Sequence, residues 1–171
     1  SSYGVKGLLI DEKNIYLSVS NEIEDECYNI TILKSPLNFD KLNFKIRYQT
    51  KECIKKANSY GAFQPIQSGG VMVNYDDREL ILALGEFRFR DKAQNDLSDF
   101  GKILKINKIN GTSKILSKGH RNVQGLFFNK NENIILSTEH GPMGGDEINI
   151  NKDLSVAKNY GWPISSYGEH Y

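Results

Sequence analysis

The sequence lacks any long apolar run and any excess of charge of one sign. No hydrophobic stretch approaches the roughly 20 residues that a membrane-spanning helix needs, so membrane insertion is not expected. The 22 basic and 21 acidic side chains leave a formal net charge of +1. This balance gives no general attraction to nucleic acid or to an anionic membrane. These observations indicate a globular protein. Its hydrophobic content of 39% is enough for a core.

Cysteine is also scarce, since Cys27 and Cys53 are the only two in the chain. Two cysteines cannot build a Cys-only zinc site. Each lies near the end of a strand-like run, so the pair is able to form a disulfide in an oxidising compartment. Two unpaired thiols are the equal alternative, and the sequence leaves this choice open.

Sustained helical periodicity is missing, and strand patterns take its place. Three segments share a glycine, an apolar run, a polar turn and a second apolar run, which predicts two strands joined by a tight turn. They are GLLIDEKNIYLSV from Gly7, GVMVNYDDRELILAL from Gly70 and GLFFNKNENIILST from Gly125. More strand-like segments follow each of them, and Asn110-Gly111 between two of these is a strong hairpin signal.

Four strands per unit of roughly 40–50 residues, plus loops, are typical of β-propeller blades. We therefore predict an all-β fold, part of one propeller domain, with about three blades of which the last is incomplete. The approximate blades are residues 1–56, 57–118 and 119–171. A closed ring needs at least about four blades, and the chain starts without Met or a signal peptide, so a fragment of a longer protein is expected.

Loops at the ends of blade strands commonly carry function, and the first candidate is GHRNVQG, residues 119–125. Arg121, Asn122 and Gln124 offer a forked cation and two amides just before a strand. Arginine suits bidentate recognition of carboxylates. The alternative is a solvated loop with one surface arginine.

The second candidate is STEHGPMGGDEINI, residues 137–150, the densest cluster of glycine, acid and histidine in the chain. Glu139, Asp146 and Glu147 are hard oxygen ligands, and the Gly-Pro turn presents backbone carbonyls. Calcium takes such a mixture, although the alternating acids of an EF-hand are missing. His140 is either a further ligand or a structural hydrogen-bonding residue.

Two further loops stand out. NYGWPISSYG, residues 159–168, places Tyr160 and Trp162 beside Gly and Pro, and such an aromatic loop either walls a ligand pocket or caps a core. LGEFRFRDKAQNDLSDFGK, residues 84–102, begins with Glu86 at a strand end, where a channel-facing acid would lie. The remainder is expected to be a long polar loop.

Together, GHRNVQGL, EHGPMGGDEINI and NYGWP, with ALGEF and AQNDLSDFGKILKIN upstream, resemble the soluble pyrroloquinoline quinone (PQQ)-dependent aldose sugar dehydrogenases, the glucose/sorbosone dehydrogenase family. The resemblance covers roughly Phe63 to Tyr171. It implies a six-bladed propeller that holds PQQ and calcium at its central channel. It also implies hydride transfer from the anomeric carbon of an aldose to the quinone, an external electron acceptor, and a periplasmic or secreted location.

The resemblance assigns roles to individual residues of the candidate loops. An arginine–asparagine pair contacts the quinone in this family, and an acid, a tyrosine and the Gly-Pro carbonyls are associated with calcium. The residues implied for the cofactor are Arg121, Asn122 and Gln124, and those implied for the metal are Glu147, Tyr160, Gly141 and Pro142.

The sequence departs from the family at the general base. The family takes the hydroxyl proton with a histidine in a stretch that reads like HQSGGR, whereas this chain reads IQSGGV. Ile66 stands at the base position, or Gln67 if the register slips by one, and Val71 replaces the arginine. Neither Ile nor Gln is a base at neutral pH, and losing a general base typically costs ~10²–10⁴ in rate. Glu86 matches the family's acid and is the candidate substitute base.

Three interpretations follow. The protein is a working PQQ-dependent sugar dehydrogenase, a propeller that binds calcium with quinone or sugar without turnover, or a structural propeller whose loops serve folding. The joint change at Ile66 and Val71 favours the second, while the intact loop motifs favour a retained cofactor site. We take the dehydrogenase as the prediction and the catalytically impaired binder as its alternative.

Overall fold

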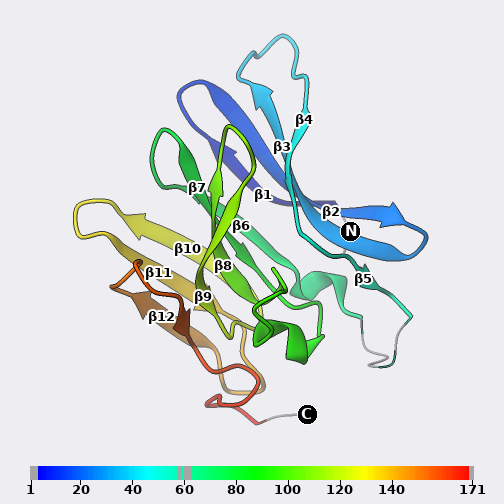
Figure 1. Cartoon of the computed structure of the whole chain (residues 1–171), viewed down its shortest axis with the longest axis vertical. Coiled ribbons are helices and arrows are strands. Elements are labelled where there is room, and N and C mark those ends of the chain that lie inside the picture. The colour runs from blue at the N-terminus through cyan, green and yellow to red at the C-terminus, as the bar shows by residue number, and fades with distance from the viewer. Residues whose placement is uncertain (1–3, 58, 60–62, 170–171) are drawn as a thin grey trace.

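The computed structural model describes residues 4–57, 59 and 63–169 of the 171-residue chain. This part of the chain consists of β-strands with two short 3-10 helices. It contains no helix long and apolar enough to cross a membrane. The strands form three sheets that follow one another in chain order and lie side by side (Figure 1).

The first sheet runs in the strand order β1-β2-β3-β4, and all of its pairs are antiparallel. A two-residue strand, β5, pairs with the start of β3. The bounds are β1 (Gly4–Ile10), β2 (Asn14–Glu24), β3 (Cys27–Pro36), β4 (Lys45–Gln49) and β5 (Ile54–Lys55). The 3-10 helix η1 (Pro65–Gln67) then leads into the second sheet.

The second sheet has the order β6-β7-β8-β9, and the third has the order β10-β11-β12. A short strand near the end of the chain, β13, returns to the second sheet and pairs in parallel with β9. The bounds are β6 (Gly69–Asn74), β7 (Glu79–Leu84), β8 (Lys102–Asn107), β9 (Ser113–Lys118), β10 (Val123–Asn129), β11 (Ile134–Glu139), β12 (Glu147–Asn151) and β13 (Lys158–Asn159), with the 3-10 helix η2 (Arg90–Ala93) between β7 and β8.

Each of the three glycine-led segments forms the first hairpin of a sheet, β1-β2, β6-β7 and β10-β11. The strand β6 contacts both β1 and β10, so the first strands of the three sheets are neighbours. Consecutive antiparallel sheets with adjoining first strands are the arrangement of propeller blades. The predicted all-β propeller fold is therefore confirmed.

The central strand β7 shows why the sequence of the middle sheet is so apolar. Its residues alternate between two faces, so Leu80 and Leu82 pack toward the first sheet whereas Ile81 and Ala83 pack toward the third. Both faces are covered, and all four side chains are fully buried. A strand with two covered faces has no reason to alternate apolar with polar residues, and ELILAL does not.

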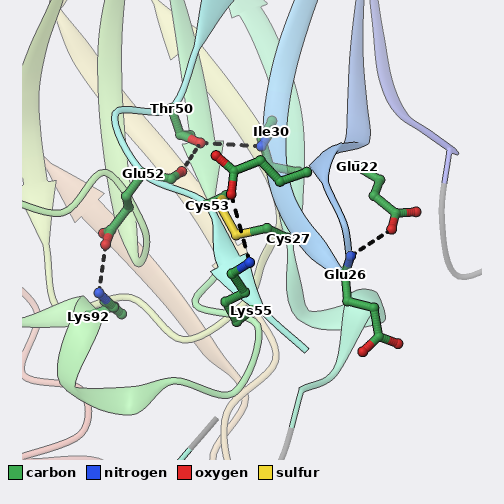
Figure 2. The surroundings of a disulfide bond; sticks show 10 residues. Glu22, Glu26, Cys27, Ile30, Thr50, Glu52, Cys53, Lys55 and Lys92 are labelled. Carbon is green, nitrogen blue, oxygen red and sulfur yellow. Dashed lines mark hydrogen bonds and ion pairs between the residues drawn. A yellow bond between two sulfur atoms is a disulfide. The ribbon is translucent and has the colours of Figure 1, made fainter. Parts of the chain in front are cut away.

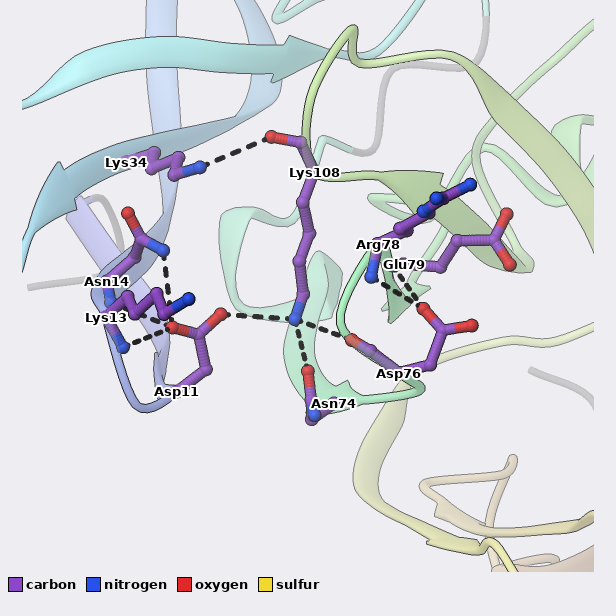
Figure 3. A network of polar contacts seen from close by, with 9 residues as sticks. All are labelled: Asp11, Lys13, Asn14, Lys34, Asn74, Asp76, Arg78, Glu79 and Lys108. Carbon is purple, nitrogen blue, oxygen red and sulfur yellow. Dashed lines mark hydrogen bonds and ion pairs between the residues drawn. The ribbon is translucent and has the colours of Figure 1, made fainter.

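At one end of the sheets, Lys108 joins the first blade to the second (Figure 3). Its side chain is 3% exposed, and its Nζ donates to Asp11 Oδ2 at 3.1 Å and to the Asp76 carbonyl at 2.8 Å. A third bond goes to Asn74 Oδ1, and Lys34 Nζ donates to the Lys108 carbonyl at 3.5 Å. A buried ammonium with three acceptors is satisfied, so this cluster serves as a clamp between blades.

At the opposite end, Cys27 and Cys53 form a disulfide across 26 residues, which settles the pairing that the sequence left open (Figure 2). The loop that carries Cys53 is held further by Thr50, whose Oγ1 accepts from the Ile30 N–H and donates to the Glu52 carbonyl. Glu52 also forms an ion pair with Lys92 of η2 at 2.6 Å. The disulfide thus fixes a loop that contacts two blades.

We expect the double substitution of Cys27 and Cys53 by Ser to lower the free energy of unfolding by about 3 kcal/mol, because the unfolded chain gains the entropy of an open loop. Denaturant unfolding followed by circular dichroism measures this change. The unsubstituted protein under dithiothreitol is the matched control and should lose a similar amount. Identical midpoints with and without reductant would contradict the stabilising role.

Candidate functional site

The topology brings the predicted site loops to one end of the sheets. Successive antiparallel strands reverse direction, so the connections that enter β6, β8, β10 and β12 all lie at the same end. These connections carry the sequence motifs around Gln67, Glu86, Arg121 and His140. Because β13 runs parallel to β9, the residue Tyr160 that follows it also lies there. Loops distant in the sequence are thus gathered into one region.

Three adjoining hollows open in this region. The largest, here called the Arg121 hollow, has a volume of about 670 Å³ and is lined by Ile66, Gln67, Arg121, Asn122, His140, Gly141, Pro142, Met143, Gly144 and Asp146. The second, the Tyr160 hollow, has about 480 Å³ and is lined among others by Asp146, Glu147, Asn149, Tyr160 and Tyr167. A third of about 270 Å³ lies between Gln124, Glu139, His140 and Glu147. Asp146 lines all three.

Arg121 is held rigidly at the edge of its hollow. Its backbone N–H donates to Glu139 Oε2 at 2.7 Å, and its Nη1 donates to the His140 carbonyl at 2.9 Å. The guanidinium carbon lies 5.5 Å from the centre of the Trp162 ring, within range of a cation–π contact. Arg90 lies 5.4 Å from the same ring. With a residue exposure of only 6%, Arg121 is a buried and pre-oriented cation rather than a solvated one.

The two amides predicted beside Arg121 are placed differently. Asn122 lines the Arg121 hollow, and its Oδ1 accepts from Gln124 Nε2 at 2.8 Å and from the Gly69 N–H at 3.3 Å. Gln124 lines only the smallest of the three hollows. The structure therefore brings Asn122 to the same cavity as Arg121 and makes Gln124 its hydrogen-bonding neighbour.

Glu139 does not offer itself as a metal ligand, because donors of the protein surround it. Its carboxylate accepts from His120 Nδ1 at 2.9 Å, from the Arg121 N–H and from Asn149 Nδ2 at 2.7 Å. Burial acts to raise the pKa of Glu139, but the bonds from His120 and the Arg121 backbone outweigh it and hold this pKa below its usual value. Glu139 is thus an ionised, buried anchor.

The predicted metal residues divide between two neighbouring hollows. Glu147 and Tyr160 line the Tyr160 hollow, whereas Gly141 and Pro142 line the Arg121 hollow. Burial, and then the negative charge of Glu139, raise the pKa of Glu147 against the bond that it receives from Asn149. The Tyr160 hydroxyl is buried and has no hydrogen-bond partner among the described residues. A bound cation would stabilise the negative charge of Glu147, which is half-buried and close to Glu139. The Tyr160 hydroxyl would add a further oxygen ligand.

The Gly-Pro turn is folded tightly on itself. The Gly141 N–H donates to Asp146 Oδ1 at 3.0 Å, and the Gly145 N–H donates to the Pro142 carbonyl at 2.8 Å. A Cβ on Gly141 would lie 1.7 Å from the Gly145 carbonyl oxygen, so no side chain fits there. His140, exposed at the rim, has its Nδ1 3.3 Å from Asp146 Oδ2.

Glu86 lies just after the end of β7, at the same end of the sheets as Arg121, whose carbonyl accepts from the Glu86 N–H at 3.2 Å. It is fully buried, and it is not among the described residues that line the three hollows. Neither carboxylate oxygen has a hydrogen-bond partner within the described part of the chain. Burial raises the pKa of Glu86 to about 8, against the lowering effect of the Arg121 and Arg90 charges. The next two residues, Phe87 and Arg88, take positive φ values of 51° and 72°.

The residues at the expected base position do reach the cavity. Ile66, 61% exposed, and Gln67 both line the Arg121 hollow. Val71, which stands where the family has an arginine, packs against the apolar cluster between the second and third sheets. It lies on β6 within the irregularity between Gly69 and Met72, where Gly69 and Gly70 have φ values of 60° and 109°.

The 84–102 loop is not the polar loop that its composition indicated. It contains η2 and buries three phenylalanines, Phe87, Phe89 and Phe100. Its Gln94 donates to the Trp162 carbonyl at 2.6 Å and exchanges two side-chain bonds with Asn159. The aromatic loop both caps a core through Trp162 and walls a hollow through Tyr160, so each alternative holds for one residue.

A sequence model of the family described as Glucose / Sorbosone dehydrogenase matches residues 8–171, nearly the whole chain. The chain belongs to this glucose/sorbosone dehydrogenase family. It is 38% identical over 116 residues to the aldose sugar dehydrogenase YliI of Escherichia coli (strain K12), a match that covers 60% of this chain and 30% of that protein.

Solved structures agree with the family fold. A glucose dehydrogenase crystal structure superposes with a TM-score of 0.80 at 28% identity, covering 100% of this chain and 52% of that one. The PQQ-bound aldose sugar dehydrogenase of Streptomyces coelicolor gives a TM-score of 0.75 over 95% of this chain and 49% of its own, and at 23% identity shows the fold alone. The chain spans about half the length of these structures, and its sequence match covers 30% of the Escherichia coli relative.

Residue-type reasoning missed the buried pair His120–Glu139. His120 lies beside Arg121 in GHRN, and Glu139 precedes His140 in EHGP. The sequence did carry a signal for this pair, because His120 and Glu139 are titratable residues that stand near strand ends within the family motifs. However, only the fold reveals that the two loops meet and that Glu139 faces inward rather than toward a metal.

Glu86 gives this family member a testable pH dependence of stability. Between about pH 4.5 and 8 the folded protein keeps Glu86 protonated while the unfolded chain releases the proton, so the free energy of unfolding falls as pH rises through this window. One proton corresponds to at most about 1.4 kcal/mol per pH unit. We expect Glu86→Gln to remove this slope in denaturant unfolding between pH 5 and 8. Glu132→Gln on the exposed β10-β11 turn is the control, and equal slopes in both variants would contradict the assignment.

Proposed function

We propose that the protein to which this chain belongs is a PQQ-dependent oxidoreductase that oxidises the anomeric hydroxyl of an aldose sugar. The observation that carries the proposal is the Arg121 hollow, where a buried, pre-oriented arginine faces a cavity built from the motif loops. Its volume of about 670 Å³ falls in the ~300–1,000 Å³ range of small-molecule sites. The named activity of the Escherichia coli relative, an aldose sugar dehydrogenase, supports the same function.

The residues present fit an anionic quinone. PQQ carries three carboxylates, and a planar guanidinium held in place pairs with a carboxylate better than a mobile ammonium does. Arg121 and Asn122 would hold PQQ, and the hydrogen bond from Gln124 Nε2 would fix the Asn122 side chain. When bound, PQQ would supply the hydride acceptor for the anomeric carbon.

Calcium is proposed for the adjoining loops. Glu147 and the unpartnered Tyr160 hydroxyl would serve a cation in the Tyr160 hollow, and the carbonyls of Gly141 and Pro142 would serve one in the Arg121 hollow. All of these donors are oxygens, which is the ligand type that calcium takes.

The expected position of the general base holds no basic side chain. Ile66 faces the hollow without a lone pair, and Gln67 is no base at neutral pH. Glu86 is protonated below about pH 8 and buried, so it would accept a proton only in the alkaline range. This observation favours, as a second candidate function, a propeller that binds calcium with quinone or sugar and does not turn over.

The disulfide bears on where the protein works. Disulfides persist in oxidising compartments, so Cys27–Cys53 supports the proposal of a periplasmic or secreted protein. In such a location the electrons from the sugar would pass to an external acceptor, as the family resemblance implies.

The binding proposal is tested by titrating PQQ into the full-length protein with and without calcium while following fluorescence. Trp162 is the one tryptophan of this chain and contacts Arg121, so a ligand in the Arg121 hollow should quench it. We expect saturable quenching that strengthens with calcium. Arg121→Ala should abolish it by removing the cation. Absence of quenching by the unsubstituted protein in both conditions would refute a cofactor site.

The missing base is tested by Ile66→His. The side chain is exposed at the hollow, so the substitution should fold, and an imidazole there should raise dye-linked aldose oxidation by roughly 10²–10⁴. Ile109→His, at an exposed isoleucine on the opposite end of the second sheet, is the matched control. If PQQ binds but neither variant gains turnover, position 66 is not where the proton leaves.

A further inference from the structure

The pairing of β2, β3 and β5 brings Glu24, Cys27 and Cys53 together at one end of the first sheet. Glu24 lies directly across from Cys27 in the β2-β3 pair, and β5, which follows Cys53, pairs with the same end of β3. A sulfur atom from each cysteine and a carboxylate oxygen of Glu24 all lie within 4.8 Å of one another. Within the part of the chain that the structure describes, no other three Cys, His, Asp or Glu side chains meet so closely. None of the three lines the hollows of the proposed cofactor site.

The two cysteines are joined in the structure, and their sulfur atoms become metal ligands when the bond is reduced (Figure 2). A reducing compartment keeps thiols free, so the chain carries both thiols until it enters an oxidising one. The Cα atoms of Cys27 and Cys53 are 5.5 Å apart, and the pairing of Cys27 with Lys55 holds the two segments at this separation. Reduction should therefore leave the two thiols facing each other.

Two thiolates and one carboxylate are a ligand set for zinc and not for calcium. Thiolates are soft ligands that zinc accepts, whereas calcium takes oxygen ligands. Ligand atoms around a tetrahedral zinc ion lie roughly 3.6–3.8 Å apart, because the bonds to zinc are about 2.0–2.3 Å long. This spacing falls inside the 4.8 Å within which the three side chains already place their donor atoms. Three protein ligands leave the fourth position to water.

Lys55 balances the charge of such a site. Two thiolates and a carboxylate carry one negative charge more than a divalent ion neutralises, and Lys55 Nζ lies 3.8 Å from Glu24 Oε2. The Glu24 side chain is 66% exposed, so a hydrated ion can reach the group from solvent. Cys27 is only 1% exposed and would shield the ion on the opposite side.

We propose that Cys27, Cys53 and Glu24 form a zinc site once the disulfide is reduced. The same two cysteines then serve as a disulfide in an oxidising compartment and as metal ligands in a reducing one. Zinc binds the thiolates, so both thiol protons leave when the metal enters. The inference is independent of the proposed function, because it uses none of the residues assigned to PQQ or calcium.

The test titrates Co²⁺, a spectroscopic probe for zinc sites, into the full-length protein under a phosphine reductant. Thiolate ligands give Co²⁺ a charge-transfer band in the near ultraviolet. We expect a saturable band in the reduced protein and none in the oxidised protein. Added Zn²⁺ should remove the band by displacing Co²⁺, whereas a large excess of Ca²⁺ should not. The absence of a band in the reduced protein, or an equal band in the oxidised protein, would overturn the inference.

Glu24→Gln distinguishes a three-ligand site from two thiols that bind metal without help. It should raise the Kd of Co²⁺ at least ~10-fold, since even a residue that only orients a metal ligand contributes roughly 10–100-fold. Glu26→Gln is the matched control, because Glu26 adjoins Cys27 but pairs with Lys56 at 3.0 Å and lies outside the three-ligand group. It should keep the Kd of the unsubstituted protein. Equal Kd values for the two variants would contradict the role of Glu24.

The fold of the reduced protein decides the remaining case. Glu24 and Cys53 reach Cys27 through strand pairing, so circular dichroism of the reduced protein should retain the strand signal. Loss of this signal on reduction would also overturn the inference. The PQQ titration uses the oxidised protein, so the failure of either proposal leaves the other standing.

Discussion

Antiparallel pairing of short strands in chain order is the constraint on which the rest of this structure depends. Because each strand reverses the one before it, the connections divide between the two ends of the sheets, and every second connection arrives at the same end. One end receives the short turns of the second and third sheets and the Lys108 clamp. The other receives the longer loops, where backbone can bend around a ligand. The site is thus a consequence of strand order before any side chain is considered.

Much of the fold could be predicted because the local signals agree with one another. The three glycine-led hairpins and the Asn110-Gly111 turn were visible in the sequence, since turn chemistry and strand periodicity are short-range properties. The course of β13 was not visible. Two residues carry no periodicity, and the parallel pairing with β9 depends on Gln94 and Gly119, which lie far from β13 in the sequence.

The sequence predicted that several motif residues lie close together, whereas their roles as cofactor and metal ligands stay predictions. Arg121, Asn122 and the Gly-Pro turn do share one hollow, as the motif order indicated. Glu86 and Val71 do not line it, because an alignment gives a residue's place along a strand but not the face that a bulge or a left-handed turn selects. Glu139 reads as a metal ligand by type. Its three protein donors become evident only when two loops and a strand are brought together.

The return of the chain from β12 to β9 has a consequence for how the molecule comes apart. The third sheet is an excursion that leaves the second sheet at Lys118 and rejoins it at Lys158, where the Tyr160 and Trp162 N–H groups bond to the Lys118 and Gly119 carbonyls. The strand β9 therefore cannot separate from the second sheet on its outer side until its pairing with β13 opens. The second and third sheets should therefore exchange their amide protons as one cooperative unit.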